Sequence, residues 1–185
     1  MANKTIIGEV RFSYLHVFEP WSADEATQKN YTATLLIPKN NTKLVEEVRK
    51  AIRGAYDVAV TEKWGGKKPP FDKVSPLRDG DEPKDDGESR GEAYEGHYFL
   101  NAKSRTQPGV IGSDRKPILD SEEFYSGCYG YASVGFSGFS HTSGKMGISI
   151  FLNNLMKTRD GEPLGGTRTT AESDFAGVQL GEDDL

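Results

Sequence analysis

Apolar and polar residues alternate along five stretches of the chain, which is the pattern of strands with one face toward a core. In the first stretch, Val10 and Phe12 fall on one face while Arg11 and Ser13 fall on the other. The five stretches cover residues 5–18, 29–37, 94–104, 128–139 and 146–156. The pattern therefore predicts a β-rich domain with long loops.

One segment, residues 42–64, has helical spacing instead. Its apolar stripe consists of Leu44, Val48, Ala51, Ile52, Ala55 and Ala59. Asn41 or Thr42 can cap the start of this helix, and Gly65 followed by Gly66 can end it. The charged side of the helix is interpreted as a solvated face. The prediction is therefore an all-β domain with a single helix.

The stretch 122–155 interleaves aromatic rings with glycines, which permit the bends and bulges of curled sheets. Alternation places Tyr129 and Tyr131 on one face of the strand, and Val134 and Phe136 on the other. One face suits a core, and the other carries flat rings beside residues too small to cover them. These rings are either core residues of an ordinary barrel or platforms on which nucleic-acid bases stack.

Three loops carry further candidate features. Residues 19–28 read as a loop that holds Trp21, which either covers the core or stacks on a base. Residues 65–93 form a long polar segment, and loops of this length are usually functional or disordered. Residues 103–116 are basic and contain a Pro-Gly turn. The basic stretch is the natural place for phosphate contacts.

The net charge of −5 comes from the last part of the chain. Residues 169–185 contain five acidic residues and no Lys or Arg, so the other 23 acids balance the 23 basic residues of the chain. This division predicts a folded domain at 1–168 and a disordered acidic tail at 169–185 that binds partners. A frayed end without a role is the alternative.

The composition argues against several other classes of protein. Cys128 is the only cysteine, so a disulfide framework and a thiolate metal cage are excluded. No apolar run reaches the roughly 20 residues of a membrane span, and the first residues lack a signal-peptide pattern. We expect no membrane association and a cytoplasmic location, which is the host cytoplasm if a phage encodes the chain.

No catalytic or metal-binding constellation is visible. The three histidines are scattered, and the segment before Gly144 does not match the spacing of a phosphate-binding loop. Asp114, Asp120, Glu122 and Glu123 could form a catalytic pair, but ordinary turn residues explain them more simply. We therefore expect a protein that is not an enzyme and has no cofactor or metal.

Several motifs resemble a family of small single-stranded DNA-binding proteins of tailed phages. The matching segments are VRFSYLHVFEP at 10–20, YTATLLIPK at 31–39, PLRDGD at 76–81, GHYFLNAKS at 96–104, EFYSGCY at 123–129 and GISIFLNNLMKTRDGEPLGG at 147–166, with an Asp-Phe step at 174–175. The resemblance implies an OB-fold body, here a five-stranded curled barrel with a long polar loop. It also implies a role in replication and recombination, with an acidic tail that contacts other proteins.

The predicted DNA site combines rings for stacking with cations for phosphates. The candidate residues are Arg11, Tyr14, Trp21, Tyr98, Phe99, Lys103, Arg105, Arg115, Lys116, Tyr125, Tyr129, Tyr131 and Lys145. Tyr98 and Phe99 alternate, so at most one of them faces DNA unless the strand bulges. The candidate partner-binding residues of the tail are Glu172, Asp174, Phe175, Glu182, Asp183 and Asp184.

The predicted ligand is single-stranded DNA, which would cross the strands that contain residues 10–18, 94–104 and 125–139. The sequence does not decide whether the chain forms a homo-oligomer. Two alternatives remain: a phage structural or assembly β-barrel that binds no nucleic acid, which the neutral body favours, and a metal-dependent nuclease that uses loop acids.

Overall fold

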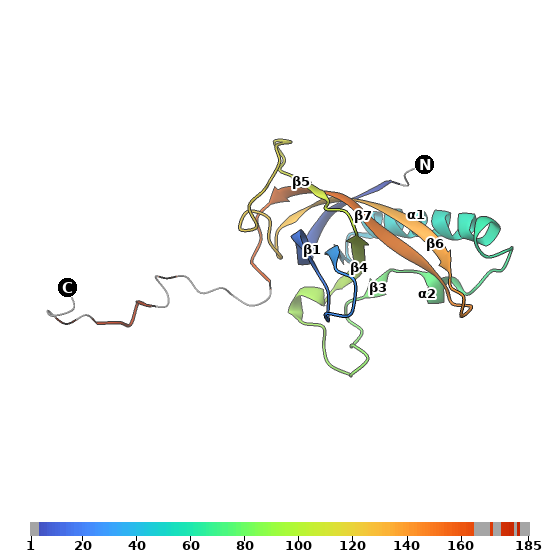
Figure 1. Ribbon diagram of the computed structural model, residues 1–185, viewed down its shortest axis with the longest axis horizontal. Coiled ribbons are helices and arrows are strands. Elements are labelled where there is room, and N and C mark those ends of the chain that lie inside the picture. Colours follow the sequence, from blue (N-terminus) through green and yellow to red (C-terminus); the bar gives the residue numbers. More distant parts are fainter. Residues whose placement is uncertain (1–3, 165–170, 172–174, 180, 182–185) are drawn as a thin grey trace.

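The computed structural model describes residues 4–164, 171, 175–179 and 181 (Figure 1). Its strands are β1 (Thr5–Trp21), β2 (Asn30–Pro38), β3 (Arg78–Asp79), β4 (His97–Ser104), β5 (Gly109–Ile111), β6 (Tyr129–Ser140) and β7 (Met146–Arg159). The helical segments are α1 (Thr42–Glu62), α2 (Phe71–Val74) and the 3-10 turn η1 (Glu92–Tyr94). The five predicted strands and the predicted helix are therefore all present, with shifted ends.

The strands form one sheet in the order β3-β4-β2-β1-β6-β7-β5, and an additional parallel pairing joins β4 to β7. This pairing aligns Lys103 with Phe151. It closes β1, β2, β4, β7 and β6 into a five-stranded barrel, which confirms the predicted OB-type fold. Both β3 and β7 use the edge of β4 that β2 leaves open, β3 at its start and β7 at its end.

Alternate residues of the strands fill the barrel. Phe12, Leu35, Leu100 and Phe136 are at most 2% exposed and belong to one core cluster. Their neighbours along each strand point outward, as a period of two requires. The predicted inward positions of the strands are therefore mostly confirmed, and burying these side chains supplies the main stabilisation of the barrel.

Two of the shifted strand ends matter for the site. β1 continues through Trp21, so the predicted loop begins only after this residue. β4 begins at His97 rather than at Tyr94, because Tyr94 lies in η1 and Gly96 has a positive φ of 70° that turns the chain before the strand.

Helix α1 lies against β6 at one end of the barrel (Figure 1). The Asn41 side chain caps it by accepting a hydrogen bond from the N–H of Leu44. Its buried residues are Leu44, Val45, Val48, Ile52, Tyr56 and Ala59. Four of them belong to the predicted stripe, while the predicted Ala51 and Ala55 are only partly buried. The indole of Trp64, just past the helix, donates a hydrogen bond of 2.9 Å to the carbonyl of Phe139. This bond fixes the helix end to β6.

The long polar segment 65–93 contains α2, β3 and η1 and is anchored to the barrel. Lys39 Nζ lies 2.6 Å from carboxylates of both Asp79 and Asp81. Gly80, between these two aspartates, packs directly against the backbone of η1. A Cβ at this position would lie 2.2 Å from the carbonyl oxygen of Tyr94. The Asp-Gly-Asp sequence therefore holds η1 against the barrel.

No helix in the part of the chain that the structure describes has the length and apolar character needed to cross a membrane.

Candidate nucleic-acid groove

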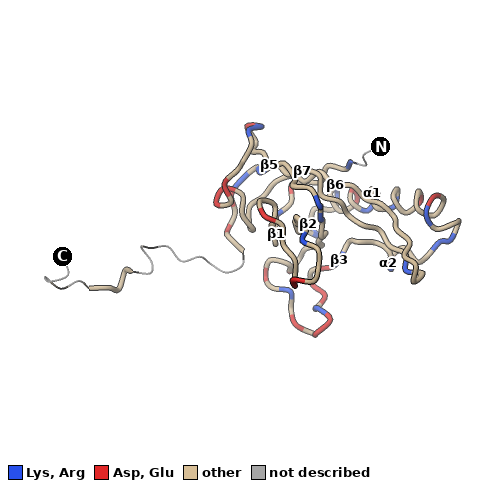
Figure 2. The backbone as a smooth tube through the Cα atoms, in the orientation of Figure 1, with Lys and Arg blue, Asp and Glu red and all other residues tan. Residues whose placement is uncertain are grey.

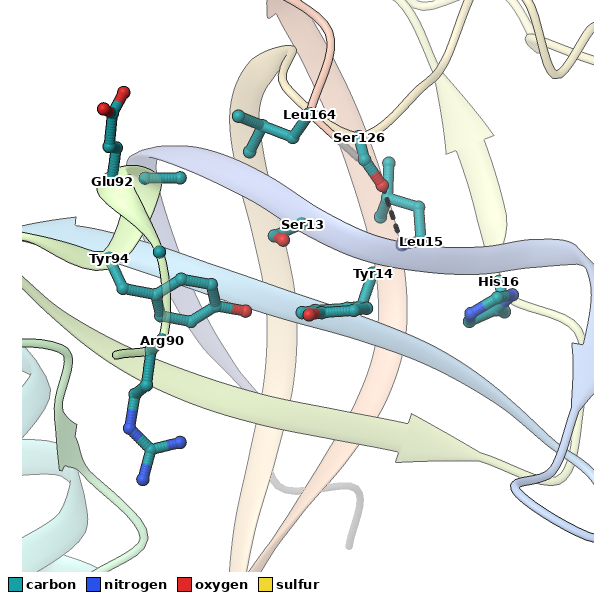
Figure 3. A pocket seen from close by; sticks show the side chains of 11 residues that line it. Ser13, Tyr14, Leu15, His16, Arg90, Glu92, Tyr94, Ser126 and Leu164 are labelled. Carbon is teal, nitrogen blue, oxygen red and sulfur yellow. Dashed lines mark hydrogen bonds between the residues drawn. The ribbon is translucent and has the colours of Figure 1, made fainter. Parts of the chain in front are cut away.

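A groove runs along the outer face of β1 (Figure 3). Its first half encloses about 550 Å³ and lies between η1 on one side and the segments at Ser126 and Leu164 on the other. Its second half, of about 500 Å³, continues past Leu15 toward Phe18 and Tyr125. The two halves share Leu15, Ser126 and Leu164. An elongated hollow of this kind can hold an extended ligand.

Tyr14 is the most exposed ring of the groove, with 63% of its surface accessible. Simple alternation would place it beside Phe12 in the core. The register between β1 and β2 shifts between Ser13 and His16, and Tyr14 has a positive φ of 46°. A β-bulge redirects side chains in this way, and a non-glycine residue with such a φ is strained. Strain of this kind often marks functional sites.

Tyr94 forms the wall of the groove beside Tyr14. It is 7% exposed and packs with Leu36 and Phe99 in a small cluster on the outside of the barrel. Its hydroxyl lies beside the side chains of Ser13 and Thr34, and burial raises the pKa of Tyr94. Tyr94 therefore fixes the shape of the groove more than it offers a free face.

His16 and Trp21 lie farther along β1. Their rings stack with centroids 5.0 Å apart and planes within 11°. Trp21 is 51% exposed, so it does not cover the core. Burial lowers the pKa of His16, which keeps its ring neutral near pH 7. The pair presents a flat surface near the groove, as a base-stacking residue would require.

The second half of the groove includes Tyr125. Its hydroxyl lies 3.0 Å from the Asp160 carboxylate and accepts a hydrogen bond from the N–H of Gly161. The ammonium group of Lys157 lies 5.3 Å from the centre of its ring and 2.6 Å from Asp160. Tyr125 therefore lines the groove, and its hydroxyl is already hydrogen-bonded within the protein.

The cations near the groove differ in their availability. The guanidinium of Arg11 donates to the carbonyls of Gly127 at 3.0 Å and of Glu162 at 2.6 Å, so it holds two loops together. Arg90 lines the groove with its guanidinium over the Phe99 ring. Lys103 is exposed on the same outer face of β4 as Asn101. Arg90 and Lys103 are thus better placed than Arg11 to meet a ligand.

Several predicted site residues lie elsewhere. Phe99 is 2% exposed under Tyr94, so its placement speaks against the predicted stacking role. The ring centre of Tyr98 lies 5.1 Å from two cations, Lys39 just after β2 and Arg49 in α1. Tyr129 lies under the guanidinium of Arg159 at 3.8 Å. These rings are not free surfaces of the groove.

The three strands expected to form one DNA-binding face are not all neighbours in the sheet. β2 separates β1 from β4, and β6 lies on the other side of β1. Tyr131 accordingly lines a different, apolar hollow with Ile6 and Met156. Residues 10–18 and 97–104 can form one surface only through β2, while the rings of β6 lie on another part of the barrel.

The remaining predicted cations lie in exposed turns. Arg105 follows β4, Arg115 and Lys116 lie in the turn after β5, and Lys145 lies between β6 and β7. None of the four lines either half of the groove. Of the predicted tail residues, Phe175 is 67% exposed. The others, Glu172, Asp174, Glu182, Asp183 and Asp184, lie outside the described residues.

Sequence reasoning missed Tyr94, His16, Arg90 and Leu164 as groove residues. Tyr94 was placed in a strand, although the Asp-Gly-Asp motif before it carried a signal that this loop is pinned to the barrel. Among the described residues, no three His, Cys, Asp or Glu side chains are grouped so that they could hold a metal ion. The only cysteine, Cys128, is fully buried, and burial raises the pKa of its thiol.

A closed five-stranded barrel with a groove along its first strand defines an OB-type β-barrel protein. The chain belongs to the family described as Enterobacter phage Enc34, ssDNA-binding protein, whose family model matches residues 3–185. It is 31% identical to protein p50 of Acyrthosiphon pisum secondary endosymbiont phage 1 over 192 aligned positions, which cover 98% of this chain and 97% of that protein.

Solved structures show the same fold. The single-stranded DNA-binding protein from bacteriophage Enc34 in complex with ssDNA is similar with a TM-score of 0.74 and 24% identity, covering 88% of this chain and 90% of that chain. The single-stranded DNA-binding protein gp2.5 of bacteriophage T7 is similar with a TM-score of 0.57 and 16% identity, covering 97% and 96%.

Proposed function

We propose that this chain is a phage single-stranded DNA-binding protein that binds without sequence specificity and acts in DNA replication and recombination. Membership of a family described by ssDNA binding supports the ligand class. The structural observation that carries the proposal is the exposed Tyr14 ring, turned out of the barrel by a strained bulge into an elongated groove.

The groove borders the face on which an OB-fold is expected to bind a strand, because its wall residue Tyr94 packs on Leu36 of β2 and Phe99 of β4. OB-folds bind oligonucleotides on the face of their second and third strands and at the loops after the first and fourth strands. In this barrel those strands are β2 and β4, and Tyr14 and Trp21 come from the neighbouring β1. Thr34 and Asn101 lie on the outer face, joined by a side-chain hydrogen bond of 2.8 Å. Bases would stack on the rings, while Arg90 and Lys103 would meet phosphates.

Stacking explains the expected lack of sequence preference. Every base has a flat face, and each stacked base contributes about 1–3 kcal/mol. An OB-fold covers about 4–16 nucleotides. A duplex hides its base faces inside the stack, so it cannot use Tyr14 in this way. The proposal therefore requires a clear preference for single strands over duplex.

The acidic tail is proposed to bind replication or recombination proteins. The exposed Phe175 and the charges after it fit an interaction segment. Its five acids can also compete with phosphates for the cations of the body through electrostatic attraction.

The test is a gel shift with oligo-dT and with a duplex of equal length, for the unchanged chain, Tyr14→Ala and Tyr131→Ala. We expect strong binding to oligo-dT, weak binding to the duplex, and a loss of about 5- to 150-fold for Tyr14→Ala, the equivalent of one stacked base. Tyr131→Ala is the matched control, because Tyr131 lies on the other part of the barrel.

Two results would contradict the proposal. Equal binding to single and double strands would remove the single-strand function, and no binding to either would favour a structural phage protein. Equal losses for both variants, each shown to be folded by circular dichroism, would place the DNA somewhere other than the groove.

A further inference from the structure

A second cavity, lined largely by cations, lies between α1, α2, β3 and the segment that leads to η1. It encloses about 810 Å³. Six basic residues line it: Arg49, Lys50, Arg53, Lys73, Arg78 and Arg90. Figure 2 shows Lys and Arg positions along α1 and beside α2. The body of the chain is neutral overall, so this cavity concentrates positive charge that the composition does not reveal.

Within the described part of the chain, these cations form no ion pair. The ion pairs of the described residues use Lys39, Lys157 and Arg159, and none uses a basic residue of the cavity. Of the three acids in the lining, Asp79 is already bound to Lys39. The other two, Asp72 and Glu82, are outnumbered by the six basic residues, so the cavity has an excess of positive charge that can attract an anion.

Aromatic rings hold the arginines in place. The guanidinium of Arg53 lies 4.1 Å from the centre of the Phe71 ring, and that of Arg49 lies 5.1 Å from the centre of Tyr98. A guanidinium that stacks on a ring keeps its N–H groups free along its edge. That geometry suits phosphate, which arginine binds through two parallel hydrogen bonds.

Arg90 connects the cavity with the groove, since it lines both. We propose that the cavity is a second phosphate site, which takes the backbone of the single-stranded DNA as it leaves the groove past Arg90. This inference rests on the proposed function. It adds a binding segment that stacks no bases and acts only on longer strands.

The test compares two charge-neutralised double variants. Arg49→Gln/Arg53→Gln removes two cations of the cavity, and Lys43→Gln/Lys63→Gln removes two exposed cations outside it, in α1 and at its C-cap. Affinity is measured by fluorescence anisotropy for oligo-dT of about 6 and about 16 nucleotides, within the range of one OB-fold. Both variants change the net charge equally, so a difference between them reports the cavity.

We expect Arg49→Gln/Arg53→Gln to weaken binding of the longer oligonucleotide about tenfold at low salt. The slope of log affinity against log salt should become shallower by about 1.4, at 0.7 for each lost phosphate contact. The control should change the slope much less, and the two variants should bind the shorter oligonucleotide within about twofold of each other.

A second variant guards against a packing effect, since Arg49 and Arg53 contact rings. Lys50→Gln/Lys73→Gln removes cavity cations that make no ring contact among the described residues, and it should show the same loss on the longer strand. Loss in the first variant without loss in the second would assign the effect to packing and overturn the proposal.

The remaining outcomes separate the two proposals. Equal behaviour of cavity and control variants on the longer strand would overturn the second site while leaving the groove intact. No binding of either oligonucleotide by the unchanged chain would overturn the proposed function itself. If the cavity variant bound the longer strand normally but no longer responded to deletion of residues 169–185, the cavity would hold the acidic tail instead, which also overturns the proposal.

Discussion

The rings of Tyr14 and Tyr94 lie with their centroids 6.4 Å apart and their planes tilted by 45°, although 79 positions separate them in sequence (Figure 3). Tyr14 reaches this place through a bulge in β1, and Tyr94 through the anchored loop before β4. One ring is exposed and the other is buried. The pair divides two tasks, contact with a ligand and support of the surface.

Tyr94→Phe should separate these tasks. The change keeps the ring but removes the buried hydroxyl beside Ser13 and Thr34, so the free energy of unfolding should fall by about 1 kcal/mol. DNA affinity should change less than threefold (about 0.6 kcal/mol), because the shape of the wall is kept. Urea unfolding and anisotropy titration measure the two effects. A large loss of affinity without a loss of stability would show that the hydroxyl contacts DNA directly.

Trp21 should report binding through its fluorescence. It is 51% exposed and stacked on His16, whereas Trp64 is 3% exposed and bonded to Phe139. A base that stacks near Trp21 should quench its emission, so oligo-dT should quench the unchanged chain. Trp21→Phe should abolish the quenching while the emission of Trp64 persists as an internal reference. Quenching that survives in this variant would move the DNA toward α1.

Gly80→Ala should disturb the groove from a distance. The new methyl group would lie 2.2 Å from the carbonyl oxygen of Tyr94 and 2.6 Å from that of His97, so backbone must shift. We expect the free energy of unfolding to fall by about 1–3 kcal/mol, as overpacking does, and DNA binding to weaken as η1 moves.

The matched control for Gly80→Ala is Gly54→Ala in the middle of α1, where a methyl group meets nothing within 4 Å. There the gain in helix propensity should stabilise the chain by up to about 1 kcal/mol. Chemical unfolding of the two variants provides the comparison. Equal stability would mean that the contact of Gly80 with η1 is loose in solution.

The Asp-Gly-Asp anchor should weaken in acid. Hydrogen bonds from Lys39 hold the pKa values of Asp79 and Asp81 below their ordinary value of 3.8. A carboxylate with a lowered pKa in the folded state stabilises the fold above its unfolded pKa, near 3.9, and loses that contribution as the pH falls through the folded value. Stability from the anchor is therefore complete at neutral pH and declines below about pH 4.

Thermal unfolding between about pH 3 and pH 6 tests this expectation. Other carboxylates, Glu9 and Asp160 among them, also have lowered pKa values and also lose their contribution to stability in acid. The informative quantity is therefore the difference in melting temperature between the unchanged chain and Asp79→Asn/Asp81→Asn. This difference should shrink as the pH falls. A constant difference would show that the carboxylate charges do not carry the anchor.

Deleting residues 169–185 should tighten binding of oligo-dT at about 50 mM salt and have little effect at about 200 mM, because the tail competes by charge. A full-length variant with its five acids changed to Gln or Asn should reproduce the effect. If only the deletion tightened binding, the tail would act through its bulk or through Phe175. If neither did, the tail would serve partners alone.

The fold followed closely from the sequence because each barrel strand alternates cleanly, as Val10 and Phe12 do in β1. The helix was equally predictable from the sequence, because its start and end depend on local features, the cap at Asn41 and the positive φ of Gly65. The placement of Tyr14 on the surface did not follow from alternation. A bulge inserts a residue and so reverses the faces to which the following side chains point. No residue type in β1 indicates the position of this bulge.

The site was harder to predict than the fold, because it depends on contacts between distant segments. Phe99 alternates to the outside of the barrel, as a stacking residue would, but η1 then covers it. Tyr129 and Tyr131 also point outward, but the strand order places β6 on the side of β1 away from β2 and β4. Alternation predicts on which face of a strand a side chain lies, but not which strands lie beside it. It therefore could not separate the surface of β1, β2 and β4 from that of β6.

Residues near the two ends of the barrel sequence are joined directly. The Arg159 guanidinium donates to the Glu9 carboxylate at 2.8 Å, and Arg11 holds the carbonyl of Glu162. During synthesis, the edge of β1 that pairs with β6 stays uncovered until β6 has been made, and the far edge of β6 stays uncovered until β7 follows. A nascent chain that stalls before residue 129 would expose the edge of β1 to neighbouring polypeptides, so translation through β6 is a condition for avoiding aggregation.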